Sequence, residues 1–429
     1  MLPQPPPPDR TRSHRGLDLL AFFVANAQTG FGPFIAVYLT SAAWTQTAIG
    51  EALSIGTVAA MLSQVPGGLL VDRLRDKRRA AFAAAAGIVL AALLFASSPT
   101  RPVVLLALVL HSVASAMLSP AIAAISLALV GHAAFGARLG RNARFAALGN
   151  GGAAVLLGAC GALVSSRAVF WLTAALMIPG LFAVAAIRRA DLTRAATPLP
   201  RAGRNLAGLR RVLTDRRLLV FLTCAVLFFF NDAALLPIAG AQVTKNSGQF
   251  ANLVIAASIV LPQLIAAAIS PLIGRCADRR GRRAMLLIGF AAVPVRGLLL
   301  SFSVDPTLLV AVQALDGLSA AAFGVTMPLV VADITKGTPH FNTAVGVVGL
   351  AISAGAALST LAAGVIADSY GHAAVFRVLA VGGLLAVLLL LVAMPETRDG
   401  GARPQPRRLR YMSTTEPSAC GRIRIGRGL

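Results

Sequence analysis

Long apolar segments alternate with short charged segments along almost the whole chain. Runs such as residues 103–130 and 373–394 contain almost no charge. A helix needs about 20 apolar residues to cross the hydrocarbon core of a membrane, and the spanning backbone must satisfy its own amides. The pattern predicts twelve membrane-spanning helices, at residues 17–40, 49–71, 80–98, 102–130, 142–164, 168–187, 217–238, 249–274, 284–303, 306–332, 342–367 and 372–394.

The composition supports an all-α integral membrane protein. Of the 429 residues, 57% are hydrophobic and only 13% are charged, whereas a soluble domain carries about 25% charged residues. The apolar segment after the proline-rich start is too long for a typical signal-peptide core and has no clear cleavage site. We therefore expect it to be retained as the first span.

The net charge of +23 is placed asymmetrically. Basic residues cluster in alternate loops, at residues 73–79, 138–144, 188–217, 275–283 and 398–427, and the loops between them hold little beyond Arg101, Arg167 and Lys245. This asymmetry predicts a membrane protein with both termini in the cytoplasm. A basic face suits anionic lipids as partners, and without interleaved aromatic residues it does not indicate nucleic acid.

The two halves of the chain repeat each other. Asp72 and Asp278 close similar charged hairpins and lie 206 positions apart (278 − 72). Three further pairs have nearly the same spacing: Pro66 and Pro271, Asn26 and Asn231, His111 and Asp316. A repeat of this kind indicates a six-plus-six duplication. It predicts a cytoplasmic segment (1–16), an N-terminal bundle (17–187), a cytoplasmic linker (188–216), a C-terminal bundle (217–394) and a basic tail (395–429).

Over residues 15–396 the chain resembles bacterial members of the major facilitator superfamily. The resemblance is strongest in the hairpin signature G-x-x-x-D-[RK]-x-G-x-[RK]-[RK]. The second hairpin (residues 274–283) matches it at Gly274, Asp278, Arg279, Gly281 and Arg283; the first (residues 68–78) matches at Gly68, Asp72 and Arg73 but has Arg75 where glycine is preferred. The resemblance implies two pseudo-symmetric six-helix bundles in the bacterial inner membrane that transport by alternating access.

The hairpin aspartates suggest a latch. Asp72 follows the second span at its carboxyl end, where its own helix dipole disfavours a negative charge. The resemblance implies that the amino end of the eleventh span approaches Asp72, and that the fifth span approaches Asp278. These contacts would hold one access state. The alternative is that the hairpins only anchor the basic face.

Polar residues within the spans indicate a cavity. The resemblance implies that spans one, four, seven and ten line it. The polar candidates on these spans are Asn26, Gln28, His111, Ser112, Ser115, Asn231, Asp232, Gln313 and Asp316. Ionisable groups at membrane depth are costly and usually functional.

Asp316 is the first candidate for a proton site, followed by His111 and Asp232. A buried carboxyl can hold a proton, and a histidine can change charge near neutral pH. The alternatives are a permanently hydrogen-bonded carboxylate and a neutral imidazole. Arg296 is a lone cation in the ninth span, which either balances a carboxylate or binds an anionic part of the substrate. Its partner helix cannot be read from the sequence.

These features predict a secondary transporter without cofactor, metal or enzymatic activity, acting as a monomer. No nucleotide-binding loop is present, and the histidines and four cysteines lack metal-site spacing. We expect proton-coupled export of a small organic molecule. The fifth span lacks the proline of the antiporter signature, which weakens that assignment. The alternatives are a proton-coupled uptake symporter and a non-transporting membrane sensor or assembly factor.

Overall fold

The predicted spans are helical in the computed structural model, which describes residues 11–31, 33–44, 46–74, 76–195, 206–239, 251–303 and 305–398. Eleven helices in this part of the chain are long and apolar enough to cross a membrane. The first half contains α1 (Thr11–Thr29), α2 (Pro33–Ser41), α3 (Gln46–Arg73), α4 (Lys77–Ser97), α5 (Arg101–Val130), α6 (Phe135–Leu163) and α7 (Ala168–Ala186). The second contains α10 (Arg216–Asp232), α12 (Ala251–Arg280), α13 (Arg282–Phe302), α14 (Pro306–Ile334), α15 (Phe341–Tyr370) and α16 (His372–Ala393).

The first predicted span is broken, so the prediction of one continuous helix over residues 17–40 was wrong. α1 ends at Thr29 and α2 begins at Pro33. Proline has no amide hydrogen and a fixed φ, which suits the first position of a helix and disfavours the interior. The remaining spans confirm the twelve-helix fold, with ends that differ from the predicted ones by several residues.

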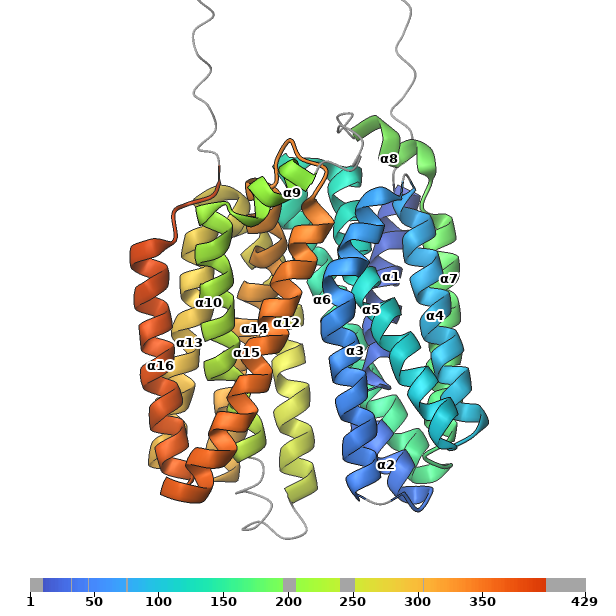
Figure 1. Cartoon of the computed structure of the whole chain (residues 1–429), viewed down its shortest axis with the longest axis vertical. Coiled ribbons are helices and arrows are strands. Elements are labelled where there is room, and N and C mark those ends of the chain that lie inside the picture. The colour runs from blue at the N-terminus through green and yellow to red at the C-terminus, as the bar shows by residue number, and fades with distance from the viewer. Residues whose placement is uncertain are drawn as a thin grey trace, which may run out of the picture. The chain divides into compact units, whose positions relative to one another are not determined.

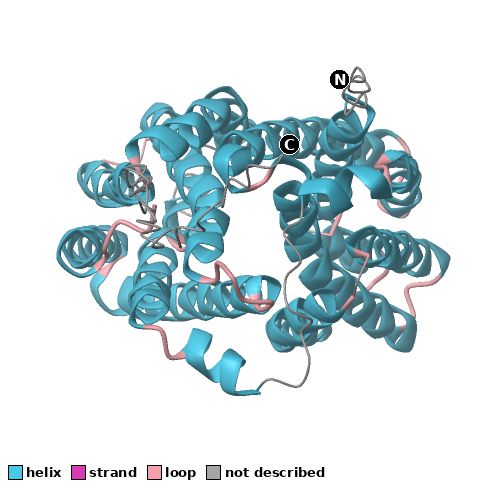
Figure 2. Cartoon of the chain, turned by 90° about the horizontal axis from the view of Figure 1, so that it is seen from above, coloured by secondary structure: helices cyan, strands magenta, loops and turns pink. Residues whose placement is uncertain are grey.

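The helices form two groups that correspond to the two halves of the sequence (Figure 1). Within the first group α1 packs on α6 and α7, and α5 packs on α3 and α4. Within the second, α12 packs on α14, and α13 packs on α14 and α16. The groups meet where α3 packs on α15 and where α6 packs on α12. Figure 2 shows this arrangement from above.

Glycines make both of these contacts close, and they repeat the duplication. A side chain at Gly68 would collide with the backbone of Asn342, and one at Gly274 with the backbone of Gly136. Deeper in the bundle, a side chain at Gly346 would collide with the carbonyl of Gln64, and one at Gly140 with the carbonyl of Ser270. Small residues let helix backbones approach closely in membranes. The same shift in sequence therefore relates the two contacts between the halves.

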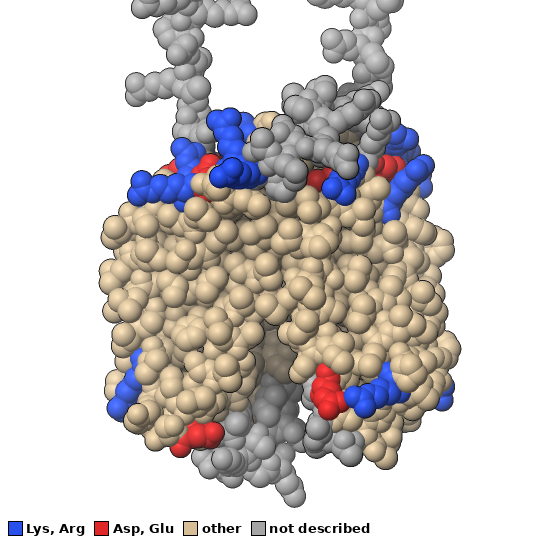
Figure 3. All heavy atoms as spheres, viewed as in Figure 1, with Lys and Arg blue, Asp and Glu red and all other residues tan. Residues whose placement is uncertain are grey.

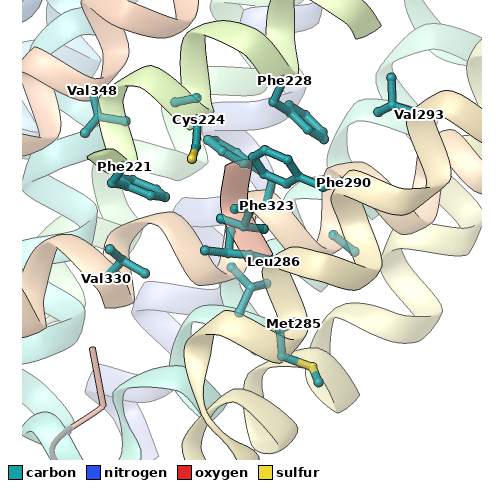
Figure 4. Packing of buried hydrophobic residues seen from close by; sticks show 14 of the residues in the cluster. Phe221, Cys224, Phe228, Met285, Leu286, Phe290, Val293, Phe323, Val330 and Val348 are labelled. Carbon is teal, nitrogen blue, oxygen red and sulfur yellow. The ribbon is translucent and has the colours of Figure 1, made fainter. Parts of the chain in front are cut away.

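Aromatic rings pack together in the cores of both halves, and in the N-terminal half Phe95 and Phe170 stack at 4.8 Å between ring centroids. In the C-terminal half, Phe228 stacks on Phe323 at 5.1 Å between ring centroids and lies 4.6 Å from Phe290 (Figure 4). In the N-terminal half, α4 buries a row of alanines, Ala80, Ala81, Ala84 and Ala85. Aromatic rings fill space between helices, whereas alanines let helices approach one another.

Lysine and arginine gather at one end of the molecule (Figure 3). We call it the basic end; it carries the first and second hairpins and the short helices α8 (Arg189–Ala195) and α9 (Leu206–Leu213). At the opposite end the surface is hollowed between the two groups of helices. Arg75, the middle of the predicted linker (196–205) and most of the predicted tail (399–429) lie outside the described residues, and the domain boundaries stay a prediction.

Candidate functional site

An ionic cluster joins three helices of the C-terminal half. Arg296 of α13 is only 2% exposed. Its Nη1 atom donates to Oδ1 of Asp232 at 2.5 Å and to Oδ1 of Asp316 at 2.6 Å. Its Nη2 atom donates to Oε1 of Gln313 at 3.1 Å. The structure thus identifies the partners of Arg296 that the sequence left open, and we call these four residues the Arg296 cluster.

The local sequence explains how these side chains reach one another. α10 ends at Asp232, the chain turns at Ala233 and Ala234, and residues 235–239 are helical again. Pro237 has no amide hydrogen to donate to the carbonyl of Ala233, so the helix is interrupted just after Asp232. Gln313 and Asp316 are three residues apart on α14 and share one face of that helix.

The Arg296 cluster holds more acid than base. Two carboxylates share one nitrogen of a single guanidinium, so one negative charge is unbalanced when both are ionised. The side chains of Asp232 and Asp316 are 17% and 27% exposed, while that of Arg296 is 2% exposed. Unbalanced charge at membrane depth is costly. Binding one proton would remove the imbalance.

His111 lies in the other half and belongs to a different environment. Its ring stacks on Phe31, with 3.8 Å between ring centroids and 11° between planes. Its Nε2 atom lies 3.3 Å from Oγ of Ser115. Its Nδ1 atom is buried without a partner, and no acidic residue pairs with the ring in the described part of the chain. The structure does not bring His111 into the Arg296 cluster.

The other predicted cavity residues are mostly packed between helices. Ser112 is buried and donates to the carbonyl of Gly56 in α3 at 3.0 Å. Asn231 donates to the carbonyl of Leu227 at 2.6 Å and faces Gly382 of α16. Asn26 is buried, and Gln28 is half-buried. Their role as cavity residues stays a prediction.

A polar bridge between the halves was missed in the sequence. Thr29 donates to Oδ1 of Asn150 at 3.1 Å, and Nδ2 of Asn150 lies 3.5 Å from Oε1 of Gln263. Asn150 belongs to α6 and Gln263 to α12. Both are polar residues within predicted spans, which was the available signal. They lie outside spans one, four, seven and ten, which the resemblance gives as the cavity helices.

The carboxylate of the first hairpin binds the amino end of α15. Asp72 accepts from the amides of Asn342 and Thr343 at 3.1 and 2.8 Å. It also accepts from Nδ2 of Asn342 at 2.7 Å and from Oγ1 of Thr343 at 2.6 Å. Free amides and the helix dipole make such an end favourable for an anion. Asp72 therefore lies where the resemblance placed it.

The carboxylate of the second hairpin binds the amino end of α6. Asp278 accepts from the amides of Gly136 and Ala137 at 3.1 and 2.8 Å. Arg282, one turn further on, lies 3.3 Å from the same carboxylate. Asp278 thus also lies at its expected helix. The contacts are those of a latch, and the gating role itself stays a prediction.

Arg282 was not singled out in the sequence, yet it organises the second hairpin. It is buried, and its Nε atom donates to Asp333 at 3.1 Å. Glu396 accepts from the amides of Arg282 and Arg283 at 2.8 and 3.1 Å. Gly281 has a φ of 109°, which favours glycine. The spacing of four residues between Asp278 and Arg282 was the available signal.

The basic cluster at residues 138–144 is not a loop, so that prediction was wrong. These residues belong to α6, and Arg138 is buried. Asp18 of α1 explains the difference, because it pairs with Arg138 at 2.5 Å and with Arg141 at 2.6 Å. A buried cation persists when a carboxylate on a neighbouring helix compensates it.

Comparison with known proteins identifies relatives that are described as transporters. The family model described as Major Facilitator Superfamily matches residues 17–258 and 221–424. An uncharacterized MFS-type transporter of Mycobacterium tuberculosis is 36% identical over 405 residues, which cover 92% of this chain and 96% of the relative. The multidrug efflux pump LfrA of Mycolicibacterium smegmatis is 32% identical over 142 residues, 33% of this chain and 28% of the pump.

Solved structures share the fold at low sequence identity. The Escherichia coli fucose:proton symporter FucP has a TM-score of 0.66 at 16% identity, with 88% of this chain and 97% of that chain covered. The human organic anion transporter MFSD10 has a TM-score of 0.66 at 17% identity, with 90% and 100% covered. At these identities the likeness concerns the fold alone.

Proposed function

Because the chain belongs to the major facilitator superfamily, we propose that it is a proton-coupled secondary transporter that exports a small organic molecule by alternating access. It is a multi-pass membrane protein of a transporter family. The positive-inside rule supports a cytoplasmic position for the basic end. The specific elements of the proposal are the coupling ion, the direction and the class of solute.

The observation that carries the proposal is the sharing of one Arg296 nitrogen by Asp232 and Asp316. With both carboxylates ionised the cluster has one excess negative charge, and with one proton it is neutral. A neutral cluster suits a closed, low-dielectric cavity, whereas the charged form is favoured when water reaches it. The loaded and unloaded forms therefore favour different access states, which is the requirement for coupling.

The arrangement of the halves supports alternating access. Asp72 and Asp278 hold the two halves together at the basic end, while the surface at the opposite end is hollowed between them (Figure 3). The glycine contacts of α3 with α15 and of α6 with α12 present little side-chain obstruction. Rocking of one half against the other would break the hairpin contacts and open the basic end.

Export is favoured over uptake by the similarity to a multidrug efflux pump. The solute class we propose is an amphipathic organic cation, because the Arg296 cluster offers two partly exposed carboxylates and the cation between them is buried. A cationic solute and a proton would then compete for the same carboxylates. Competition of this kind produces exchange of one for the other.

The test is transport by the purified protein in proteoliposomes with an imposed pH gradient, using ethidium and a panel of amphipathic amines as probes. Asp316→Asn should abolish pH-driven accumulation while solute–solute exchange without a gradient continues. Asp305→Asn is the matched control, because Asp305 caps the amino end of the same helix outside the cluster and asparagine is an equally good cap.

Unchanged pH-driven flux in Asp316→Asn would contradict the proton site. If solute accumulates only when it moves in the same direction as the proton, the protein is an uptake symporter and not an exporter. If no probe moves under any gradient in the native protein while these probes bind, a sensor function is supported instead.

A further inference from the structure

A groove with a volume of about 540 Å³ lies between the two halves near the basic end. Five residues of α6 line it, Ala137, Arg141, Arg144, Phe145 and Leu148, together with Pro271 and Arg275 of α12. The spacing of three and four residues places each set on one face of its helix. The groove is therefore formed jointly by one helix of each half, outside the Arg296 cluster.

The lining changes from charged to apolar with depth. α6 runs inward from the basic end, so Leu148 lies about 10 Å deeper than Arg141 at 1.5 Å per residue. α12 runs the other way, so Pro271 lies deeper than Arg275. Both walls thus place arginine near the membrane surface and apolar groups below it. A phospholipid has the same order, with its phosphate above its acyl chains.

Two of the three arginines in the groove are not paired with a carboxylate in the described part of the chain. Arg141 is engaged by Asp18, with its Nε atom 3.0 Å from each carboxylate oxygen. Arg144 and Arg275 are exposed and make no ion pair within the described residues. The Nε atom of Arg275 donates only to the carbonyl of Pro271, at 3.3 Å. The groove therefore presents two uncompensated positive charges, one from each half.

We infer that this groove binds one anionic phospholipid, whose phosphate lies between Arg144 and Arg275 and whose acyl chain lies along Phe145, Leu148 and Pro271. A bidentate arginine contact is the usual means of holding a phosphate. The exposed Leu148 and the half-buried Phe145 form a wall that a free anion would not use. The lipid would bridge the halves.

The position of the groove connects the lipid with the second hairpin. Ala137 also lines the groove, and its amide donates to Asp278. A lipid that holds α6 and α12 together would favour the state in which this contact is made. This consequence rests on the proposed alternating access, whereas the binding site itself does not.

The experiment is native mass spectrometry of the delipidated full-length protein, titrated separately with phosphatidylglycerol, phosphatidylethanolamine and inorganic phosphate. We expect one phosphatidylglycerol to be retained in preference to phosphatidylethanolamine. The double variant Arg144→Gln/Arg275→Gln should retain phosphatidylglycerol about thirtyfold more weakly, as expected for two arginines near an anionic lipid. Arg144→Lys/Arg275→Lys should recover part of the affinity. Arg210→Gln, at an exposed arginine of α9 that does not line the groove, is the matched control.

Native-like retention by the double glutamine variant would overturn the site, and so would equal retention of both lipids by the native protein. Inorganic phosphate that displaces the lipid at millimolar concentration would identify the groove as a site for a soluble anion instead. Thermal unfolding in phosphatidylethanolamine nanodiscs checks that the variants are folded. If the glutamine variant unfolds, Leu148→Gln, which makes the acyl-chain region polar without adding a charge, should lower retention, and its failure to do so would overturn the proposal.

Discussion

The two halves of this protein share a helical arrangement but differ in their charges. Helices α4 and α13 begin 205 positions apart, as do α5 and α14. At that spacing Asp232, Arg296 and Asp316 correspond to Ala27, Ala91 and His111. Ala27 and Ala91 are fully buried. The same scaffold therefore occurs twice, and among the described residues only the C-terminal copy has charged partners at all three of these positions.

This difference separates two roles. The C-terminal half holds a cluster whose net charge changes when one proton binds. The equivalent region of the N-terminal half presents His111 stacked on Phe31, an aromatic surface. We infer that coupling belongs to the C-terminal half, and that the N-terminal half contributes contacts to the organic part of the solute.

The hairpins show a second difference on the same scaffold. Asp72 is held by amide and hydroxyl donors of Asn342 and Thr343. Asp278 lacks such side-chain donors, because the equivalent positions are Gly136 and Ala137, and it is accompanied by the cation Arg282. The first contact is therefore made by hydrogen bonds to uncharged groups, and the second belongs to a network of charges.

The largest effect is expected from removing the cation of the Arg296 cluster. Arg296→Met leaves two partly exposed carboxylates at membrane depth without a counter-charge, which should lower the free energy of unfolding by up to about 3–5 kcal/mol. The triple variant that adds Asp232→Asn and Asp316→Asn should recover most of the loss. Thermal unfolding in detergent measures both. If Arg296→Met is as stable as the native protein, Arg296 does not stabilise the fold by pairing with Asp232 and Asp316.

A smaller effect is expected from opening the hairpins. Asp72→Ala or Asp278→Ala removes charge-assisted hydrogen bonds worth about 1.5–3 kcal/mol each, so the basic end should open more often. Matched reporters exist at Gln64→Cys and Ser270→Cys, which lie at equivalent glycine contacts of α3 with α15 and of α12 with α6.

In a background without the native cysteines, both reporters should react about tenfold faster with a soluble maleimide in either hairpin variant. They should respond together because the two contacts close the same end. Unaltered labelling would mean that the hairpins only anchor the basic face.

A finer difference is expected between the hairpins themselves. Thr343→Val removes one hydroxyl donor from Asp72 and should weaken the first contact by about 1 kcal/mol, with little dependence on salt. Arg282→Gln removes a buried cation that binds Asp278 and Asp333, and its effect should be larger. The labelling rates of the Gln64→Cys and Ser270→Cys reporters measure the effect of each of these two substitutions. If Thr343→Val and Arg282→Gln raise the labelling rates equally, the two hairpin contacts do not differ in strength as proposed.

The smallest effect is expected at His111. His111→Asn should leave pH-driven accumulation in proteoliposomes unchanged, because no acidic partner accompanies the ring in the described part of the chain. Affinity for an aromatic probe should fall instead, as the stacking surface on Phe31 is lost. Loss of pH-driven accumulation in His111→Asn would assign coupling to both halves.

Much of the fold followed from local patterns. Span length, the placement of basic residues and the repeated hairpin predicted the twelve helices and the duplication. The break after Thr29 was overlooked, although Pro33 marks it. The sequence also did not predict the burial of Arg138, because a basic cluster at the end of a span is typical of a loop. The compensating carboxylate, Asp18, lies on another helix.

The sequence by itself determined that this protein spans a membrane, that its halves are duplicated, and that Asp232, Arg296 and Asp316 are charges within spans. Only the tertiary structure decided that these three charges meet. The reason is physical: the spans are apolar on nearly every side, so no amphipathic period reveals how each helix is rotated. The carboxylate partners of Arg296 lie 20 and 64 residues away on other helices, and packing alone brings them together.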